Sequence, residues 1–307
     1  MSSANAPLVE TVRFSAKKWL ARTLDVLGIN RVGIALQRLF PSSYIRVLYY
    51  HDVEPRQAAA FEAQLLLLRR YFEPASQHEL RAFLQTGRWP HSKPGIVLTF
   101  DDGLRSNYEV AAPLLEKHGF QGWFFVPIGL VTLPPRQQPR SADGQLVTHG
   151  NDVSRDPRVF MRAQELRDLA HRHIIGCHTS SHVRLSEALP PATLDFEILD
   201  AKRMLEETMG KPVDSFAWVG GEEWAYSSGA ARRIEREFRF AFTTNSRAVR
   251  ATTSALQIDR THVEADYPAY LVRFQLSGIM DLRHAGKRKR VARRIANDTG
   301  VSRAIPA

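Results

Sequence analysis

The chain has 307 residues, of which 44% are hydrophobic, and carries a formal net charge of +10 at pH 7. This length is enough for one large core, because α/β barrels commonly form single domains of roughly 200 to 250 residues. The single cysteine, Cys177, excludes an internal disulfide, and no stretch reaches the roughly 18 to 20 apolar residues of a membrane-spanning helix.

Residues 1–44 are expected to form a separable helical segment in which apolar residues such as Trp19 and Leu24 alternate with cations such as Lys18 and Arg22. This composition is typical of an interfacial amphipathic helix, with a solvated surface as the alternative. The charges also interrupt every apolar run, so no secretory signal is predicted. We therefore expect a cytoplasmic protein with a peripheral contact at the inner membrane surface.

Most of the chain, residues 45–268, is expected to form one catalytic domain, followed by a basic C-terminal tail over residues 269–307. The tail contains the cluster GKRKRVARR at Gly286 to Arg294. Runs of like charge are usually solvated surface. Nucleic-acid binding is not expected, because no recognition motif or aromatic platform accompanies the cations.

Short apolar strands alternate with amphipathic helices along this domain. The predicted strands are Ile45–Tyr50, Gly95–Phe100, Gly122–Val126, His173–Cys177, Ser215–Val219 and Phe240–Thr244. The predicted helices are Ala58–Phe72, Tyr108–His118, Arg162–His171, Pro191–Met209 and Ser228–Phe238. The polar, proline-rich stretch from Pro134 to Pro157 is expected to be an inserted loop. This alternation predicts an α/β fold with a parallel sheet that is closed or nearly closed into a barrel.

Two motifs follow strands of this predicted barrel. The strand GIVLTF leads directly into Asp101, Asp102 and Gly103, and a second apolar segment leads into His178 and His182. Residues that follow the strands of a parallel barrel gather on one face. One carboxylate and two imidazoles suit zinc or a similar divalent ion and leave positions open for water and substrate. The sequence therefore predicts a catalytic metal site formed by Asp102, His178 and His182.

The remaining groups suggest acid–base chemistry around this ion. Gly103 allows the chain to turn, so that Asp101 is free to act as a general base on water. A proton donor for a leaving nitrogen is also needed, and His51, at the end of the first strand, is our choice. His262, which follows a more interrupted apolar stretch, is the alternative.

Each motif alone has an ordinary structural explanation. An Asp-Asp pair is most often a turn or a helix cap, and two histidines at this spacing are often accidental. The placement of both motifs after apolar strands, with a third strand ending at His51 and Asp52, favours a site over coincidence.

The sequence resembles the polysaccharide deacetylases with the NodB homology domain, carbohydrate esterase family 4, from about Ile45 to about Thr244. TFDDG at Thr99 to Gly103 matches the first motif of the family, and HTSSH at His178 to His182 matches the second. The resemblance implies a distorted (β/α)7 barrel, Asp101 as the base, and Asp102 and both histidines as ligands of zinc, with cobalt or nickel as alternatives.

The segment YYHDV, Tyr49 to Val53, resembles the start of the subgroup that includes poly-N-acetylglucosamine deacetylases. In that subgroup the strand with the catalytic histidine has moved to the beginning of the domain, which supports His51 as the acid. The third family motif departs from the pattern: it stands here as FAWVGG from Phe216 to Gly221, without its arginine or proline. A backbone N–H of Val219 or Gly220 is expected to stabilise the oxyanion.

We therefore expect an amidohydrolase that removes acetyl groups from an N-acetylated sugar, either in a polysaccharide or in a lipid-linked or nucleotide-linked intermediate. The departure in the third motif keeps a second hypothesis open, a sugar-binding or scaffolding barrel that has lost turnover. An oxygenase that uses two histidines and one carboxylate is a third, weaker alternative.

Overall fold

The structure is a computed structural model that describes residues 6–39, 43–139 and 158–296. Most of the predicted inserted loop, including His149, lies outside these residues, as do the two ends of the chain. The strands are β1 (Ile45–Tyr50), β2 (Glu73–Pro74), β3 (Gly95–Phe100), β4 (Gly122–Val126), β5 (Ile174–Cys177), β6 (Ser215–Ala217), β7 (Phe240–Thr243), β8 (Ile258–Asp259) and β9 (Thr261–His262).

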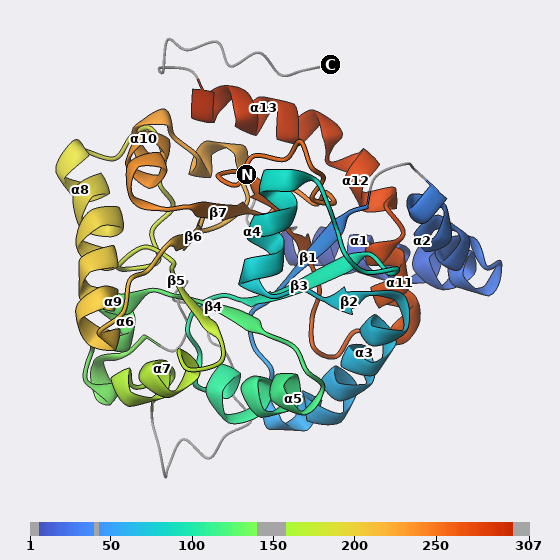
Figure 1. Cartoon of the computed structure of the whole chain (residues 1–307), viewed down its shortest axis with the longest axis horizontal. Helices are drawn as coiled ribbons and strands as arrows, with labels where there is room; N and C mark the ends of the chain where they lie inside the picture. Colours follow the sequence, from blue (N-terminus) through green and yellow to red (C-terminus); the bar gives the residue numbers. More distant parts are fainter. Residues whose placement is uncertain (1–5, 40–42, 140–157, 297–307) are drawn as a thin grey trace.

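The helices surround the strands (Figure 1). They are α1 (Ala6–Val26), α2 (Ile29–Leu39), α3 (Ala58–Tyr71), α4 (Gln77–Thr86), α5 (Ala112–Lys117), α6 (Ile128–Val131), α7 (Ala163–Leu169), α8 (Pro191–Asp195), α9 (Ala201–Met209), α10 (Ser228–Glu237), α11 (Ala269–Leu276), α12 (Ile279–Arg283) and α13 (Ala285–Ala296). Within the described residues, no helix is both long and apolar enough to cross a membrane.

The strands form a nearly closed parallel barrel, which confirms the predicted fold class. Their order around the barrel is β8-β7-β6-β5-β4-β3-β1-β9, and β2 pairs with β3 outside this path. Every paired strand is parallel to its neighbour, and β1 and β3 pair over their full length, from Ile45 with Gly95 to Tyr50 with Phe100. The strand predictions are correct to within two residues at each end for β1 and β3 to β7.

Two hydrophobic clusters explain why the central strands are mainly apolar. Val97 of β3 and Trp123 of β4 belong to the inner cluster, together with Phe83 of α4, which packs over one end of the barrel. Their neighbours Leu98 and Phe124 belong to the outer cluster, beneath the surrounding helices. Successive side chains of a strand point to opposite faces, so a strand buried on both faces is mainly apolar, and its few polar side chains, such as Thr99, are paired inside the protein.

The ends of the barrel meet in one short segment that the sequence pattern did not predict. Strands β8 and β9 are separated only by Arg260; β8 pairs with β7 and β9 pairs with β1. The run from Ile258 to His262 therefore bridges the two edges of the sheet, with Arg260 at the junction.

The chain outside the predicted catalytic domain is mostly helical. The expected N-terminal segment contains α1 and α2, and the expected basic tail begins with α11, whose residues Leu271, Val272 and Leu276 are buried. Helix α11 packs against both α1 and α2. Helices α1, α2 and α11 therefore form a joint layer beside β1 and β9, at the right of Figure 1.

Candidate active site

The predicted site residues follow adjacent parallel strands. His51 follows β1, Asp101 and Asp102 follow β3, and His178 follows β5. Because β1, β3, β4 and β5 are neighbours in this parallel sheet, their carboxyl ends lie at the same end of the barrel, here called the mouth. The sequence predicted this convergence from the positions of the strands alone.

Asp102, His178 and His182 form a compact cluster at the mouth. The Asp102 Oδ1 atom lies 3.1 Å from His182 Nε2 and 3.6 Å from His178 Nε2. Ligand atoms of all three residues lie within 4.8 Å of one another, and the three side chains are 14%, 2% and 7% exposed, in chain order. One carboxylate and two imidazoles thus face a common point beneath the surface.

The backbone around this cluster adopts a conformation that non-glycine residues seldom use. Asp102, Thr179 and His182 have positive φ angles of 72°, 64° and 60°, and Gly103 continues the turn with φ 63°. Left-handed residues at such positions carry a conformational cost and gather at functional sites. The turn after β3 therefore begins at Asp102 itself, one residue earlier than the predicted turn at Gly103.

Neighbouring groups hold the two histidines in place. The Nδ1 atom of His178 lies 2.8 Å from the carbonyl oxygen of Ala217 at the end of β6, a contact that leaves Nε2 to face Asp102. Glu197, buried in the helical layer, accepts hydrogen bonds from the backbone N–H groups of Ser180 and Ser181, each at 2.9 Å. Glu197 thereby fixes the turn between the histidines, and no pattern in the sequence marked it.

The protonation states suit a metal ion. Burial alone would raise the pKa of Asp102, but the contact with His182 and the charge of His51 outweigh it, and the pKa lies below its ordinary value. Burial lowers the pKa of His178 to about 4, against the opposing effect of Asp101. Near neutral pH the cluster therefore offers an ionised carboxylate and a neutral imidazole, the forms that bind metals.

The residues present fit a divalent cation. Among the described residues, Asp102 Oδ1 is a buried oxygen that accepts no hydrogen bond of normal geometry, although it points at two imidazole nitrogens. An oxygen in this position without a proton donor is costly unless a cation occupies the space. Asp102, His178 and His182 are thus the residues that could hold a metal ion.

Asp101 has a different partner. Its Oδ1 and Oδ2 atoms accept hydrogen bonds of 2.6 and 2.9 Å from the guanidinium of Arg260, and neither side chain is more than 4% exposed. Burial by itself would raise the pKa of Asp101, but the charge of Arg260 outweighs it and the pKa falls below its ordinary value. The buried bidentate pair keeps Asp101 ionised and fixed in one orientation.

Arg260 is the main site residue that the sequence did not reveal. It also donates to Thr99 Oγ1 at 3.0 Å and to the carbonyl of Thr243 at 3.2 Å, and its guanidinium lies 4.9 Å from the centre of the Tyr49 ring. The third motif from Phe216 to Gly221 lacks the arginine expected there. The barrel closure supplies a guanidinium to Asp101 from Arg260, between β8 and β9.

Both candidates for the proton donor lie at the mouth. The rings of His51 and His262 are 5.8 Å apart, and His262 Nε2 lies 2.7 Å from a carboxylate oxygen of Glu264. These three residues form a second group with ligand atoms within 4.8 Å, but it is more open than the first: His262 and Glu264 are 32% and 37% exposed. The structure therefore brings His51 and His262 together and places the Glu264 carboxylate in contact with His262.

The predicted oxyanion residues lie beside the histidine cluster. Val219 is buried and follows Ala217, the residue whose carbonyl contacts His178. Gly220 has a positive φ of 75°, and an added Cβ there would come within 2.8 Å of Arg184 and 2.6 Å of Glu222. The turn is therefore built for glycine, beneath the ion pair between Arg184 and Glu222.

Comparisons with known proteins agree with this picture. Residues 89–238 match the family model described as polysaccharide deacetylase. No curated protein matches the chain by sequence.

The fold is similar to those of solved deacetylases. One is the deacetylase PplD of Streptococcus pyogenes in complex with acetate, with 19% identity over 76% of this chain and 99% of that chain and a TM-score of 0.60. Another is IcaB from Ammonifex degensii, with 21% identity over 76% of this chain and 96% of that chain and a TM-score of 0.57. A third is a de-N-acetylase from Aggregatibacter actinomycetemcomitans, with 15% identity over 76% of this chain and all 100% of that chain and a TM-score of 0.59. At these identities the likeness establishes the fold.

Proposed function

We propose that the chain is an amidohydrolase of the polysaccharide deacetylase family, whose model matches residues 89–238, and that it is metal-dependent and removes N-acetyl groups from an amino sugar in a polysaccharide or a lipid-linked glycan. The observation that carries this proposal is the convergence of Asp102, His178 and His182 beside the ionised Asp101. The mouth therefore contains both a group that could hold a cation and a carboxylate that could act as a base.

Asp102, His178 and His182 would hold the divalent ion, and zinc suits this ligand set, with cobalt and nickel as alternatives. When bound, the ion supplies a Lewis acid for the amide carbonyl and lowers the pKa of water at the site. The carbonyl of Ala217 keeps the His178 ring oriented for this task. Glu197 does the same for the turn that carries His182.

Asp101 acts as the general base. It is ionised, buried and held on both oxygens by Arg260, so its position is fixed before substrate arrives. It removes a proton from the attacking water, and the Arg260 charge stabilises the ionised form to which the carboxylate must return. A base oriented in advance needs little reorganisation in the transition state.

His51 acts as the general acid toward the departing nitrogen. It lies at the mouth and is close enough to Asp101 and Asp102 for its charge to lower the pKa of both carboxyl groups. His262 is the alternative donor, but its Nε2 already contacts Glu264. The products are acetate and a free amine on the sugar, and the backbone at Val219 or Gly220 would donate to the oxyanion.

The test is acetate release from N-acetylglucosamine oligomers by the full chain, before and after chelation. We expect chelation to abolish acetate release, zinc, cobalt or nickel to restore it, and elemental analysis to find about one ion per chain. A protein that binds the oligomers and the ion but releases no acetate would favour the alternative, a sugar-binding barrel without turnover. Full activity in metal-free protein would contradict the proposed mechanism.

A further inference from the structure

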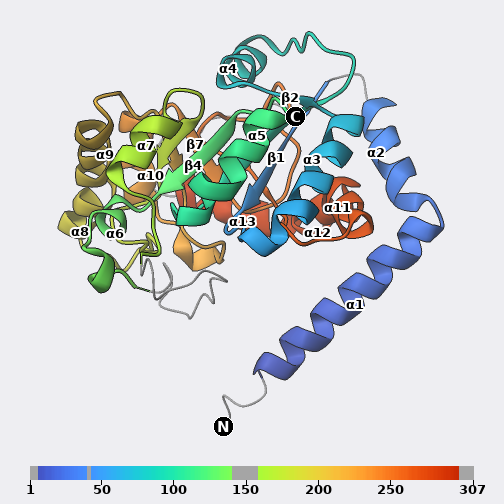
Figure 2. The ribbon, with the colours of Figure 1, turned by 90° about the horizontal axis from the view of Figure 1, so that it is seen from below.

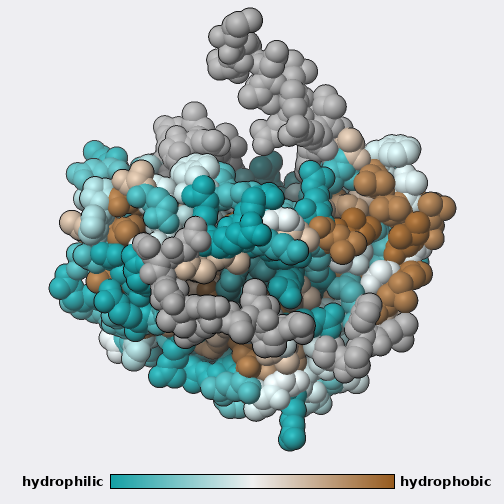
Figure 3. Space-filling model, turned by 90° about the horizontal axis from the view of Figure 1, so that it is seen from above, coloured by the Kyte–Doolittle hydropathy of each residue, from teal (hydrophilic) through white to brown (hydrophobic). Residues whose placement is uncertain are grey.

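The helical arm formed by α1 and α2 carries most of the large apolar side chains that are exposed in the described residues. Seven of the eleven such side chains lie on it: Trp19, Leu20, Val26, Leu27, Ile29, Val32 and Leu36. Figure 3 shows brown, apolar residues gathered at the right side of the molecule, where this arm lies. A contiguous apolar surface of this kind usually marks an interaction site.

The same face is positively charged. Lys18, Arg22 and Arg31 are exposed between the apolar residues, whereas the single acidic residue from 16 to 37, Asp25, faces Arg273 of α11 in a salt bridge. We propose that the outer face of the arm binds the surface of an anionic lipid bilayer. The apolar side chains suit the boundary of the lipid acyl chains, and the cations between them suit the lipid phosphates.

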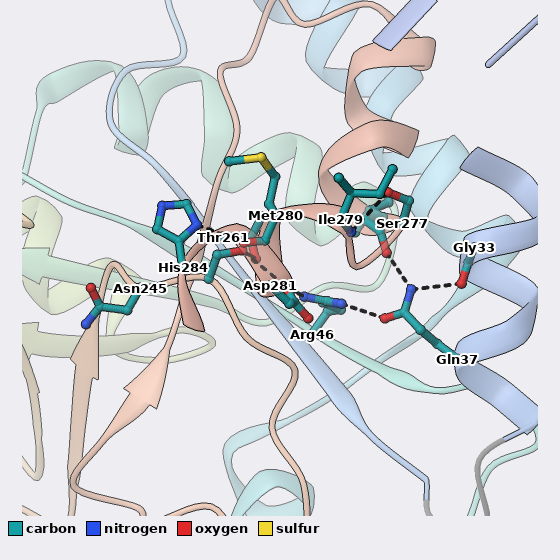
Figure 4. A network of polar contacts seen from close by, with 12 residues as sticks. Gly33, Gln37, Arg46, Asn245, Thr261, Ser277, Ile279, Met280, Asp281 and His284 are labelled. Carbon is teal, nitrogen blue, oxygen red and sulfur yellow. Dashed lines mark hydrogen bonds and ion pairs between the residues drawn. The ribbon is translucent and has the colours of Figure 1, made fainter. Parts of the chain in front are cut away.

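The arm is fixed to the barrel. The side-chain amide of Gln37 donates to the carbonyl of Leu276 at 2.9 Å, and its oxygen accepts a hydrogen bond from the buried Arg46 of β1 (Figure 4). Gly33 lies so close to α11 that an added Cβ would come within 2.9 Å of the Ser277 carbonyl. A bilayer bound to the arm would therefore hold the barrel in a defined orientation.

The inner side of the arm lies near the mouth. The ammonium of Lys17 on α1 lies 5.9 Å from the centre of the Tyr267 ring, and that ring is 6.1 Å from His262 at the mouth. Figure 2 shows α1 running along the flank of the barrel and projecting beyond it. We infer that the substrate class is an N-acetylated amino sugar on a lipid carrier, an inference that rests on the proposed function.

Vesicle flotation of the full chain tests the lipid contact. We expect the protein to float with vesicles that contain phosphatidylglycerol, and less with pure phosphatidylcholine. Trp19→Ser with Leu27→Ser should weaken binding about tenfold or more, because two large apolar side chains no longer enter the interface. Arg22→Gln with Arg31→Gln should weaken it about fivefold per cation, only with anionic vesicles and most strongly at low salt.

A matched variant controls for general surface effects. Leu66→Ser with Arg203→Gln removes an apolar residue and a cation that are 57% and 67% exposed elsewhere on the barrel, and it should float like the parent. Parent protein that stays at the bottom of the gradient with both vesicle types overturns the proposal. So does a parent dimer in light scattering that the arm variants convert to monomer without any flotation, since a second copy then covers the face.

Acetate release separates this inference from the proposed function. Two substrates are compared, a soluble N-acetylglucosamine oligomer and an N-acetylglucosamine glycoside with a long alkyl chain inserted in anionic vesicles. The arm variants should keep the parent rate on the first and lose about tenfold on the second, in line with their lost binding. Equal rates for parent and arm variants on the vesicles contradict the substrate class, whereas no acetate from either substrate with the parent contradicts the proposed function and leaves the flotation result standing.

Discussion

The mouth of the barrel holds two groups of the same composition, each with two imidazoles and one carboxylate whose ligand atoms lie within 4.8 Å of one another. In the buried group, Asp102 Oδ1 faces His178 and His182 and accepts no hydrogen bond of normal geometry. In the open group, Glu264 contacts His262 at 2.7 Å, and both are about one third exposed.

This difference shows that burial and pairing, rather than residue type, decide the chemistry. A buried carboxylate without a proton donor favours a cation, because the low-dielectric surroundings strengthen its attraction and water cannot replace it. In the more exposed pair, the carboxylate of Glu264 is already in contact with an imidazole nitrogen. We therefore propose that the first group binds the metal ion and that the second transfers the proton.

The largest effect should follow from loss of the buried carboxylate. Asp102→Asn removes the charge between His178 and His182, so we expect the purified variant to lack the metal ion and acetate release to fall to background. Elemental analysis and the acetate assay measure this. Glu264→Gln is the matched control in the open group and should keep a full complement of metal; if it lost the ion while Asp102→Asn kept it, the two assignments would have to be exchanged.

The base at the end of β3 should give the next largest effect. Asp101→Asn keeps the size of the side chain but cannot accept a proton, so we expect the rate to fall by about 10²- to 10⁴-fold. The metal content should stay at the parent level, because both Asp101 oxygens are held by Arg260 and Asp101 is not part of the ligand group of Asp102, His178 and His182. A variant that also lost its metal would show that both aspartates serve the ion, contrary to the division proposed here.

The roles of the two histidines in the open group can be distinguished by comparing their variants. His51→Gln should lower the rate by about 10²-fold and remove the alkaline limb of the pH profile, as loss of the general acid requires. His262→Gln should lower it by about tenfold, since a partner that only orients another group has a smaller effect. The reverse order would make His262 the acid, with Glu264 as its positioning partner.

Much of the fold was predictable because the central strands are buried on both faces. The bounds of β1, β3 and β4 follow from largely apolar runs rich in β-branched or aromatic residues, which are followed by His51, Asp101 and Pro127. The closing strands β8 and β9 have two residues each, with Arg260 between them, so they show no periodicity. Their pairing depends on the two sheet edges that they join, which no local pattern contains.

The cluster of Asp102, His178 and His182 was predictable for a similar reason. Asp102 follows β3 and the two histidines follow β5, so the order of strands in the sequence is enough to place all three at the mouth. The contact between Arg260 and Asp101 joins residues 159 positions apart, and a buried arginine resembles any surface arginine in a sequence pattern. The departure in the third motif left the orientation of the base open, and only the three-dimensional structure shows the guanidinium that holds it.

An effect as small as that of His262→Gln should come from Arg260→Lys. A lysine keeps the positive charge but loses the bidentate hydrogen bonds and the stacking on Tyr49, so we expect a roughly tenfold lower kcat with little change in KM and no loss of metal. The control is Arg46→Lys, at another fully buried arginine, which pairs with Asp281 at 2.7 Å. Arg46→Lys should lower the thermal unfolding temperature about as much as Arg260→Lys does. Unlike Arg260→Lys, it should leave the activity of each folded molecule unchanged.

The pH profile shows whether Arg260 acts through Asp101. The positive charge lowers the pKa of Asp101, and the base works only when ionised, so removing the charge must move the acid limb of the rate profile to higher pH. We expect that shift in Arg260→Met and not in Arg260→Lys, which retains the charge. Acid limbs that coincide in the parent and both variants would mean that Arg260 supports the barrel closure alone, because a purely structural role changes the amount of folded protein and not the pKa of its base.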